Sequence, residues 1–264
     1  MNKIVAFIDF TELSDKIIRQ SIVLCKQTKA ELALLHVLSK DNASVEQEAE
    51  TKLNAFAQRV KDQGIPCTVM IGNGNFFQTA PILLVKADCE LAIIGTHGIK
   101  GLYQNLFGSN IWKLVSNLPC SALVISQFTE VSEQGFNHAM LPIGPHAEFD
   151  KKVLFTSELI AKSGKASFFG IDKAGIEISK EMMERVHQGK ALFKENGIPS
   201  DFVQYESRQY SVGFAKETLS YAKEHSYDLI SILARISSEN AHFGQLDKEA
   251  MLLNEYGIPV LCVR

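Results

Sequence analysis

Short apolar runs alternate along the chain with longer segments in which apolar residues recur every three or four positions. In the first half the runs cover residues 4–8, 32–37, 67–71, 91–94 and 122–125. Continuous apolar runs of this length are typical of strands that are buried on both faces. The apolar residues from Val45 to Val60 follow the spacing of an amphipathic helix, which should end at Gly64.

Further helices are predicted at residues 14–25, 78–87 and 109–117, the second with Pro81 in its first turn. The second half shows the same order, with strands predicted at residues 139–142, 166–171, 201–205, 229–233 and 260–263. Strands that alternate with helices pair in parallel through right-handed crossovers. We therefore predict an α/β protein with an open, doubly wound sheet of five parallel strands in each half.

An internal repeat supports the division into halves. KDQGIPCTVMI (61–71) resembles KENGIPSDFVQY (194–205), CELAIIG (89–95) resembles YDLISIL (227–233), and NLPCSALVIS (117–126) resembles YGIPVLCVR (256–264). The three matches occur in the same order at a nearly constant offset, as expected for two homologous domains. We place these domains at residues 1–130 and 137–264. The polar stretch QFTEVSEQGFNH (127–138) is the predicted linker.

Composition narrows the class of protein. The net charge is −3, with 46% hydrophobic and 22% charged residues, and no basic tract suggests a nucleic-acid partner. The apolar runs are too short to cross a membrane, and the N-terminus lacks the apolar segment of a signal peptide. The five cysteines include no CxxC pair and their odd number does not suit a disulfide framework. We expect them to pack as small hydrophobes in a reducing cytoplasm.

The stretch IIGTHGIKGLYQNLFGSNIWKLV (93–115) has the spacing Gly95-x2-Gly98-x9-Gly108-Ser109. It begins at a predicted strand end and leads into a predicted helix, where the free N–H groups and the helix dipole attract anions. Ligands of doubly wound sheets bind at such strand ends. The alternative is a surface loop that uses glycine for its turns, which is our interpretation of Gly101.

These features together resemble the universal stress proteins, whose ATP-binding branch carries Gly-x2-Gly-x9-Gly-Ser/Thr after the fourth strand. GTHG (95–98) is similar to the GSHG that is frequent in that family. FIDFTELS (7–14) resembles the end of the family's first strand, and LLHV (34–37) resembles the end of its second. The resemblance spans the first half and, more weakly, the second. It implies two tandem Rossmann-like domains of the adenine nucleotide alpha hydrolase type.

The resemblance also implies a binding site for ATP, ADP or AMP, with or without magnesium. Asp9, beside Ile8, would accept a hydrogen bond from ribose or adenine, and Val37 would line the adenine pocket. Gly95 and Gly98 would border the ribose and phosphates, and the phosphates would accept from the backbone N–H groups of Gly108, Ser109, Asn110 and Ile111. From its place between the glycines, His97 is a further candidate for a phosphate contact, with a solvated loop histidine as the alternative. From the residues alone, the alternative for Asp9 is a helix-start residue before Thr11 and Ser14. The alternative for Val37 is strand core, and both roles are compatible.

The second half departs from this pattern. Leu233, Ile236, Lys248 and Glu249 stand where the first half has Gly95, Gly98, Gly108 and Ser109. A glutamate there would repel phosphates. We therefore expect no nucleotide in the second half, which would serve as the built-in partner of the first. In the family the last strands of two domains pair with each other. The resemblance therefore implies that residues 122–125 pair with residues 260–263, which would make the chain an intramolecular pseudo-dimer. A homodimer of two such chains is a further option.

The sequence leaves three functional hypotheses. The leading one is an adenine-nucleotide-binding regulatory module of the stress response. The second is a slow ATPase or phosphotransferase, which lacks support because Lys100 is the loop's only basic residue and no general base stands out. The third is an interaction scaffold without nucleotide. We assign no catalytic residue and no metal site, since His97 has no second ligand at metal spacing, and we interpret His36 as a core histidine.

Overall fold

The computed structural model describes residues 1–39, 43–96, 111–144, 148–172, 178–207, 213–235 and 244–264. Its strands are β1 (Lys3–Phe7), β2 (Glu31–Leu38), β3 (Cys67–Asn73), β4 (Leu91–Thr96), β5 (Ser121–Ser126), β6 (Phe136–Pro142), β7 (Ile160–Asp172), β8 (Ser200–Glu206), β9 (Leu229–Leu233) and β10 (Val260–Val263). Its helices are α1 (Glu12–Thr28), α2 (Ala43–Lys61), α3 (Phe76–Lys86), α5 (Ile111–Asn117), α6 (Phe149–Leu159), α7 (Lys180–Glu195), α8 (Phe214–Glu224) and α9 (Gln245–Leu252).

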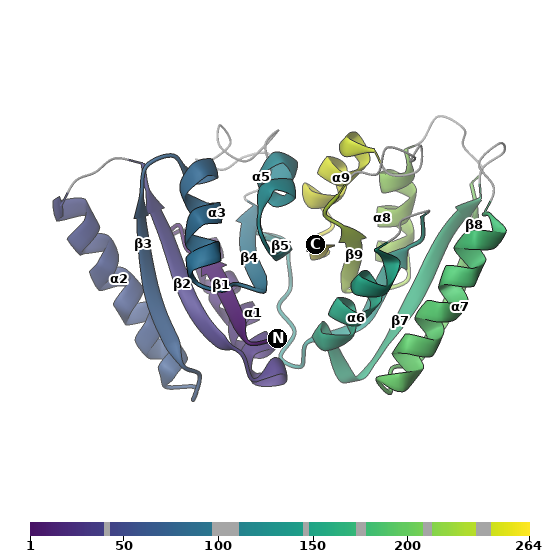
Figure 1. Ribbon diagram of the computed structural model, residues 1–264, viewed down its shortest axis with the longest axis horizontal. Coiled ribbons are helices and arrows are strands. Elements are labelled where there is room, and N and C mark those ends of the chain that lie inside the picture. Colours follow the sequence, from purple (N-terminus) through teal and green to yellow (C-terminus); the bar gives the residue numbers. More distant parts are fainter. Residues whose placement is uncertain (40–42, 97–110, 145–147, 173–177, 208–212, 236–243) are drawn as a thin grey trace.

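All ten strands form one continuous sheet in the order β3-β2-β1-β4-β5-β10-β9-β6-β7-β8 (Figure 1). From the centre outward, the order is β5-β4-β1-β2-β3 in the first half and β10-β9-β6-β7-β8 in the second. The two halves therefore have the same strand order. Neighbouring strands are parallel except at the centre, where β5 and β10 are antiparallel, with Leu123 opposite Leu261. The predicted α/β class and the predicted pairing of the two last strands are confirmed.

Helices cover both faces of the sheet and create two hydrophobic cores. Successive strand residues point to opposite faces, so Ile4 and Ala6 belong to one core while Val5 and Phe7 belong to the other. The first core lies under α1, α2, α6 and α7, and the second lies under α3, α5, α8 and α9. Both cores run through the two halves, since α1 packs against α6 and α5 packs against α9.

Several predicted boundaries need correction. The helix α3 begins at Phe76 rather than at residue 78, because the Asn75 side chain accepts a hydrogen bond from the Phe77 N–H and caps it there. Pro81 therefore lies inside the helix and not in its first turn. Strand β6 starts at Phe136, three residues early, which shortens the linker.

Side chains of α1 tie the first half to the linker and to the second half. The Lys16 ammonium donates to the backbone carbonyls of Gln127, at 2.5 Å, and Thr129, at 2.8 Å. The Gln27 amide donates to two carbonyls at the end of α6 and the start of β7, each at 2.7 Å. The linker is thus held against the first half.

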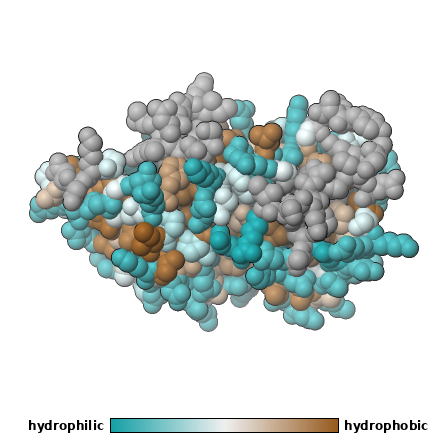
Figure 2. All heavy atoms as spheres, turned by 45° about the horizontal axis from the view of Figure 1, so that its top comes forward, coloured by the Kyte–Doolittle hydropathy of each residue, from teal (hydrophilic) through white to brown (hydrophobic). Residues whose placement is uncertain are grey.

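Figure 2 turns the upper edge of Figure 1 toward the viewer. Described side chains on this face are mostly hydrophilic, and hydrophobic ones form small separate groups. Within the described residues, no helix is both long and apolar enough to cross a membrane.

Candidate ligand-binding site

A cavity of about 520 Å³ opens at the carboxyl ends of the strands in the first half. Its volume is within the range of small-molecule sites. It lies beside the ends of β1 and β4. This is the switch point of the doubly wound sheet, because the chain adds strands on one side of β1 first and then on the other. The lining residues are Phe7, Ile8, Asp9, Ile17, Leu35, His36, Val37, Leu38, Ser39, Gly74, Asn75, Phe76, Ile94 and Gly95.

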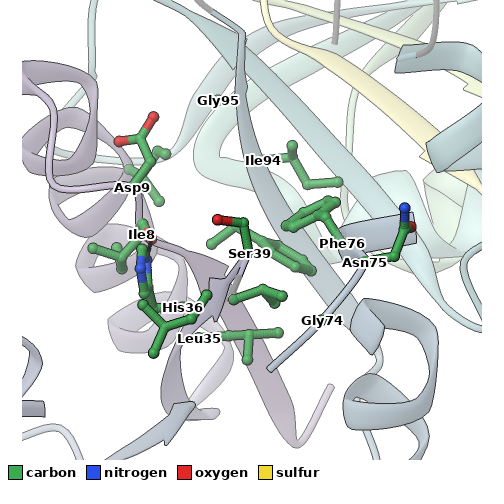
Figure 3. A pocket seen from close by; sticks show the side chains of 14 residues that line it. Ile8, Asp9, Leu35, His36, Ser39, Gly74, Asn75, Phe76, Ile94 and Gly95 are labelled. Carbon is green, nitrogen blue, oxygen red and sulfur yellow. Dashed lines mark hydrogen bonds between the residues drawn. The ribbon is translucent and has the colours of Figure 1, made fainter. Parts of the chain in front are cut away.

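Two walls face each other across the cavity (Figure 3). Ile8, Asp9 and His36 lie on one side, and Asn75 and Phe76 lie on the other. The first wall comes from the ends of β1 and β2, and the second from the turn between β3 and α3. Parallel strands end at the same edge of a sheet, which explains why residues so far apart in the chain meet here.

Asp9 organises the turn that leads from β1 into α1. One of its carboxylate oxygens, Oδ1, accepts hydrogen bonds from the Thr11 N–H at 3.0 Å, the Thr11 hydroxyl at 2.6 Å and the Ser14 hydroxyl at 2.8 Å. The interpretation of Asp9 as a helix-start residue is therefore correct. Asp9 also lines the cavity, so the structural role and a ligand-binding role are compatible.

His36 differs from the expected core histidine because it is only half-buried and lines the cavity. Its Nδ1 lies 2.6 Å from the Ile8 carbonyl oxygen. A carbonyl only accepts, so Nδ1 carries the hydrogen, and Nε2 of the neutral ring is then an acceptor. The centres of the Phe10 ring and the imidazole lie 4.6 Å apart. The backbone of Phe10 has a φ of 61°, which is uncommon for a residue other than glycine.

The wall from the β3–α3 turn was missed in the sequence. Gly74 has a φ of +115°, a conformation that side chains rarely adopt, and it lets the chain reverse directly after β3. Asn75 follows as the cap of α3, and Phe76 then projects toward the cavity. The signal was the pair Asn73-Gly74, a common turn sequence, followed by Asn75, a residue type that favours helix caps.

Gly95 lines the cavity and also permits close packing of α1 on β4. A Cβ added there would lie 2.5 Å from Leu13 Cδ2 and 2.9 Å from Ile17 Cδ1, both on α1. Leu13 and Ile17 are almost fully buried, so they have little room to move. The fold thus has its own use for this glycine, besides any contact with a ligand.

The structure brings Ile8, Asp9, Val37 and Gly95 together around the cavity. Ile111 is the first residue of α5, and its side chain is fully buried in the core. The implied contact runs through its backbone N–H and stays a prediction. The other predicted contacts, His97, Gly98, Gly108, Ser109 and Asn110, lie outside the described residues.

The lining offers aromatic and aliphatic surface together with a few polar groups. None of the described lining residues is a lysine or an arginine. In the described part of the chain, no group of three or more His, Cys, Asp or Glu side chains is arranged to hold a metal ion. The cavity is thus suited to a flat, largely apolar group that also carries hydrogen-bond donors.

The corresponding strand ends of the second half hold two buried lysines. The Lys248 ammonium donates to the carbonyls of Leu233, at 3.0 Å, and Arg235. The Lys152 ammonium donates to the Pro142 carbonyl at 2.6 Å. Both lysines are at most 2% exposed. The strand-end carbonyls of β6 and β9 are therefore occupied by the protein's own ammonium groups.

Known proteins are similar to the first half of the chain. The model of the Universal stress protein family matches residues 1–126. Universal stress protein Sll1388 of Synechocystis is 21% identical over 148 residues, which cover 47% of this chain and 96% of that protein.

Solved structures extend the likeness to the whole chain. A universal stress protein from Archaeoglobus fulgidus is 16% identical and has a TM-score of 0.74, covering 100% of this chain and 96% of its own. A putative universal stress protein from Pseudomonas aeruginosa is 15% identical and has a TM-score of 0.67, covering 100% and 93%. Residues 1–126 are therefore similar to the Universal stress protein family, and the chain as a whole has the fold of solved universal stress proteins.

Proposed function

We propose that this protein is a tandem universal stress protein that binds an adenine nucleotide in its first half, as a regulatory module of the stress response. The single observation that carries the proposal is the cavity at the switch point of the first half, with Asp9 and Gly95 on its lining. Adenine is flat and apolar on its faces, and ribose carries hydroxyl donors.

The residues of the cavity fit these two parts of a nucleotide. Phe76, Leu35 and Val37 would enclose the base between apolar side chains, and Asp9 would accept a hydrogen bond from a ribose hydroxyl. The resemblance implies phosphates beside Gly95 and Gly98 and at the backbone N–H groups of residues 108–111. Magnesium, if bound, needs few protein ligands because the phosphates supply oxygens.

The second half would serve as a structural partner rather than as a second nucleotide site. Lys152 and Lys248 occupy its strand-end carbonyls with buried ammonium groups. The β5–β10 pair would then act as an internal version of a dimer contact. We further propose a cytoplasmic location and no nucleic-acid partner, in keeping with the net charge of −3.

Calorimetric titration with ATP, ADP and AMP, with and without magnesium, tests the proposal. The wild type should bind at least one of them, and Val37→Phe should abolish binding because the larger side chain fills the cavity. Val203→Phe is the matched control, since Val203 is also a partly buried strand valine packed on the same core layer, but in the second half. At a hundred times the dissociation constant, ligand should add about 2.7 kcal/mol of stability. The proposal is wrong if the folded wild type binds none of the three nucleotides.

A further inference from the structure

Two cysteines meet at the amino ends of β4 and β5, at the opposite end of the strands from the cavity. Cys89 lies between α3 and β4, and Cys120 directly precedes β5. The strands β4 and β5 are parallel neighbours, with Leu91 opposite Ser121, so their amino ends lie side by side. This register places the two Sγ atoms 3.4 Å apart, with the Cys120 thiol donating to the Cys89 sulfur.

We propose that Cys89 and Cys120 form a reversible disulfide when the protein meets a peroxide. Hydrogen peroxide first oxidises the Cys89 thiolate to a sulfenic acid, with release of hydroxide. The Cys120 sulfur then attacks the Cys89 sulfur and expels the sulfenic oxygen as water. In total two thiols and one hydrogen peroxide give one disulfide and two waters, so the peroxide takes up both electrons and both protons.

The other cysteines are placed less favourably. Cys25, Cys67 and Cys262 are free and almost fully buried, whereas Cys89 is partly exposed. An oxidant therefore reaches Cys89 more easily, and the resolving sulfur of Cys120 is already in contact with it. Bond formation needs only a small approach of two sulfur atoms whose backbones sit on paired strands.

The environment of the pair sets the rate of the reaction. The close contact with the Cys120 thiol, together with burial, raises the pKa of the Cys89 thiol. Since the thiolate is the form that reacts with peroxide, oxidation should be slow at neutral pH and should accelerate as the pH rises.

The disulfide would close a loop that contains β4, the glycine stretch and α5. A crosslink across a loop of this length restricts the unfolded chain and should raise the Tm by about 5–10 °C. The crosslink lies at the amino ends of the strands, away from the cavity at their carboxyl ends. The inference is therefore independent of the proposed nucleotide site.

The test treats the full-length protein with hydrogen peroxide under native conditions, blocks remaining thiols and maps the digest by mass spectrometry. We expect a peptide pair joined through Cys89 and Cys120, together with a rise in Tm, and dithiothreitol should reverse both. Cys89→Ser and Cys120→Ser should lose both effects, whereas Cys67→Ser is the control that should keep them. Circular dichroism verifies that each variant is folded before treatment.

Several outcomes would overturn the inference. One is peroxide-treated wild type in which Cys89 is oxidised to sulfinic or sulfonic acid without a crosslink. Others are a crosslink that joins two different chains, and both thiols remaining free at peroxide levels that oxidise exposed methionines.

Discussion

At the residue scale, polar side chains that are tied to the backbone define the strand ends in both halves. In the first half, Asp9 holds the turn after β1 through Thr11 and Ser14. In the second half, Lys152 and Lys248 bond the strand-end carbonyls themselves. The equivalent strand ends thus carry a partly exposed carboxyl group in the first half and buried lysine side chains in the second.

Replacing Asp9 should separate its structural role from its charge. Asp9→Ala removes the acceptor of three hydrogen bonds and should lower the free energy of unfolding by about 1–3 kcal/mol. Asp9→Asn keeps an acceptor oxygen in the same place and should cost less. Urea denaturation of both variants measures the difference. Equal losses for the two would show that the charge, and not the hydrogen-bond acceptor, holds the turn.

The buried lysines should make the stability of the protein depend on pH. Burial, with repulsion from Lys248, lowers the pKa of Lys152 to about 7, and burial lowers the pKa of Lys248 to about 8. In the unfolded chain the ordinary value is 10.5. Above the folded pKa values the unfolded chain therefore binds more protons than the folded one, so stability rises with pH.

We expect this rise between pH 7 and pH 9, with a slope of at most about 1.4 kcal/mol per pH unit for each lysine. Lys152→Met removes one of the titrating groups and should flatten the curve. Denaturant titrations of wild type and variant across this range measure the two slopes, and the comparison cancels groups common to both. Identical slopes would contradict a lowered pKa for Lys152.

At the element scale, helix caps connect local sequence with the cavity. Asn75 caps α3 by accepting from the Phe77 N–H at 3.0 Å, and Ser179 caps α7 by accepting from the Met182 N–H at 3.2 Å. Asn75 also lines the cavity, whereas Ser179 lies in the second half. The two caps can therefore be compared directly, because they make the same kind of hydrogen bond and only Asn75 lies beside the proposed ligand.

Asn75→Ala and Ser179→Ala should each lower the free energy of unfolding by about 1 kcal/mol, the usual cost of a lost cap. Chemical denaturation measures this cost. Only Asn75→Ala should also change the affinity for nucleotide in a calorimetric titration. A similar change in Ser179→Ala would mean that affinity follows overall stability rather than the cavity wall.

At the scale of the whole molecule, the central β5–β10 pair makes one sheet of two halves. The helices α5 and α9 pack together beside it, and the Lys248 ammonium lies 4.9 Å from the centre of the Trp112 ring. Trp112 is the only tryptophan in the chain and is 3% exposed. Its fluorescence therefore reports directly on the contact between the halves.

We expect the two halves to unfold together, because both hydrophobic cores run across the centre of the sheet. Denaturation followed by Trp112 fluorescence and by far-ultraviolet circular dichroism should give coincident transitions. A fluorescence change that precedes the loss of secondary structure would show instead that the halves separate before they unfold. A Trp112→Phe variant provides the baseline for the fluorescence signal.

Much of the architecture could be predicted from the sequence, because strand and helix periodicities are local properties. The strands β9 and β10 occur at the predicted residues. The helix α2 buries Ala49, Leu53 and Val60 as predicted, whereas Val45 in its first turn is exposed. Boundaries were less accurate where a single side chain decides them, as Asn75 does for α3. The domain limits at residues 130 and 137 stay a prediction.

The candidate site was predictable only in part. The family resemblance implied Ile8, Asp9, Val37 and Gly95 as site residues, and all four line the cavity. His36 and the wall at Asn75 and Phe76 were not found as site residues, since their role depends on which strand ends face each other. That arrangement comes from sheet order, which no short stretch of sequence contains.

By itself, the sequence determined the alternation of strands and helices, the likeness of the two halves and the glycine spacing after the fourth strand. Only the tertiary structure decided that Gly95 is needed beneath Leu13, that Lys248 points inward to strand-end carbonyls, and that Cys89 meets Cys120. The physical reason is that periodicity depends on neighbours in the chain. Contacts such as these depend instead on strand order and register, which join residues that are distant in sequence.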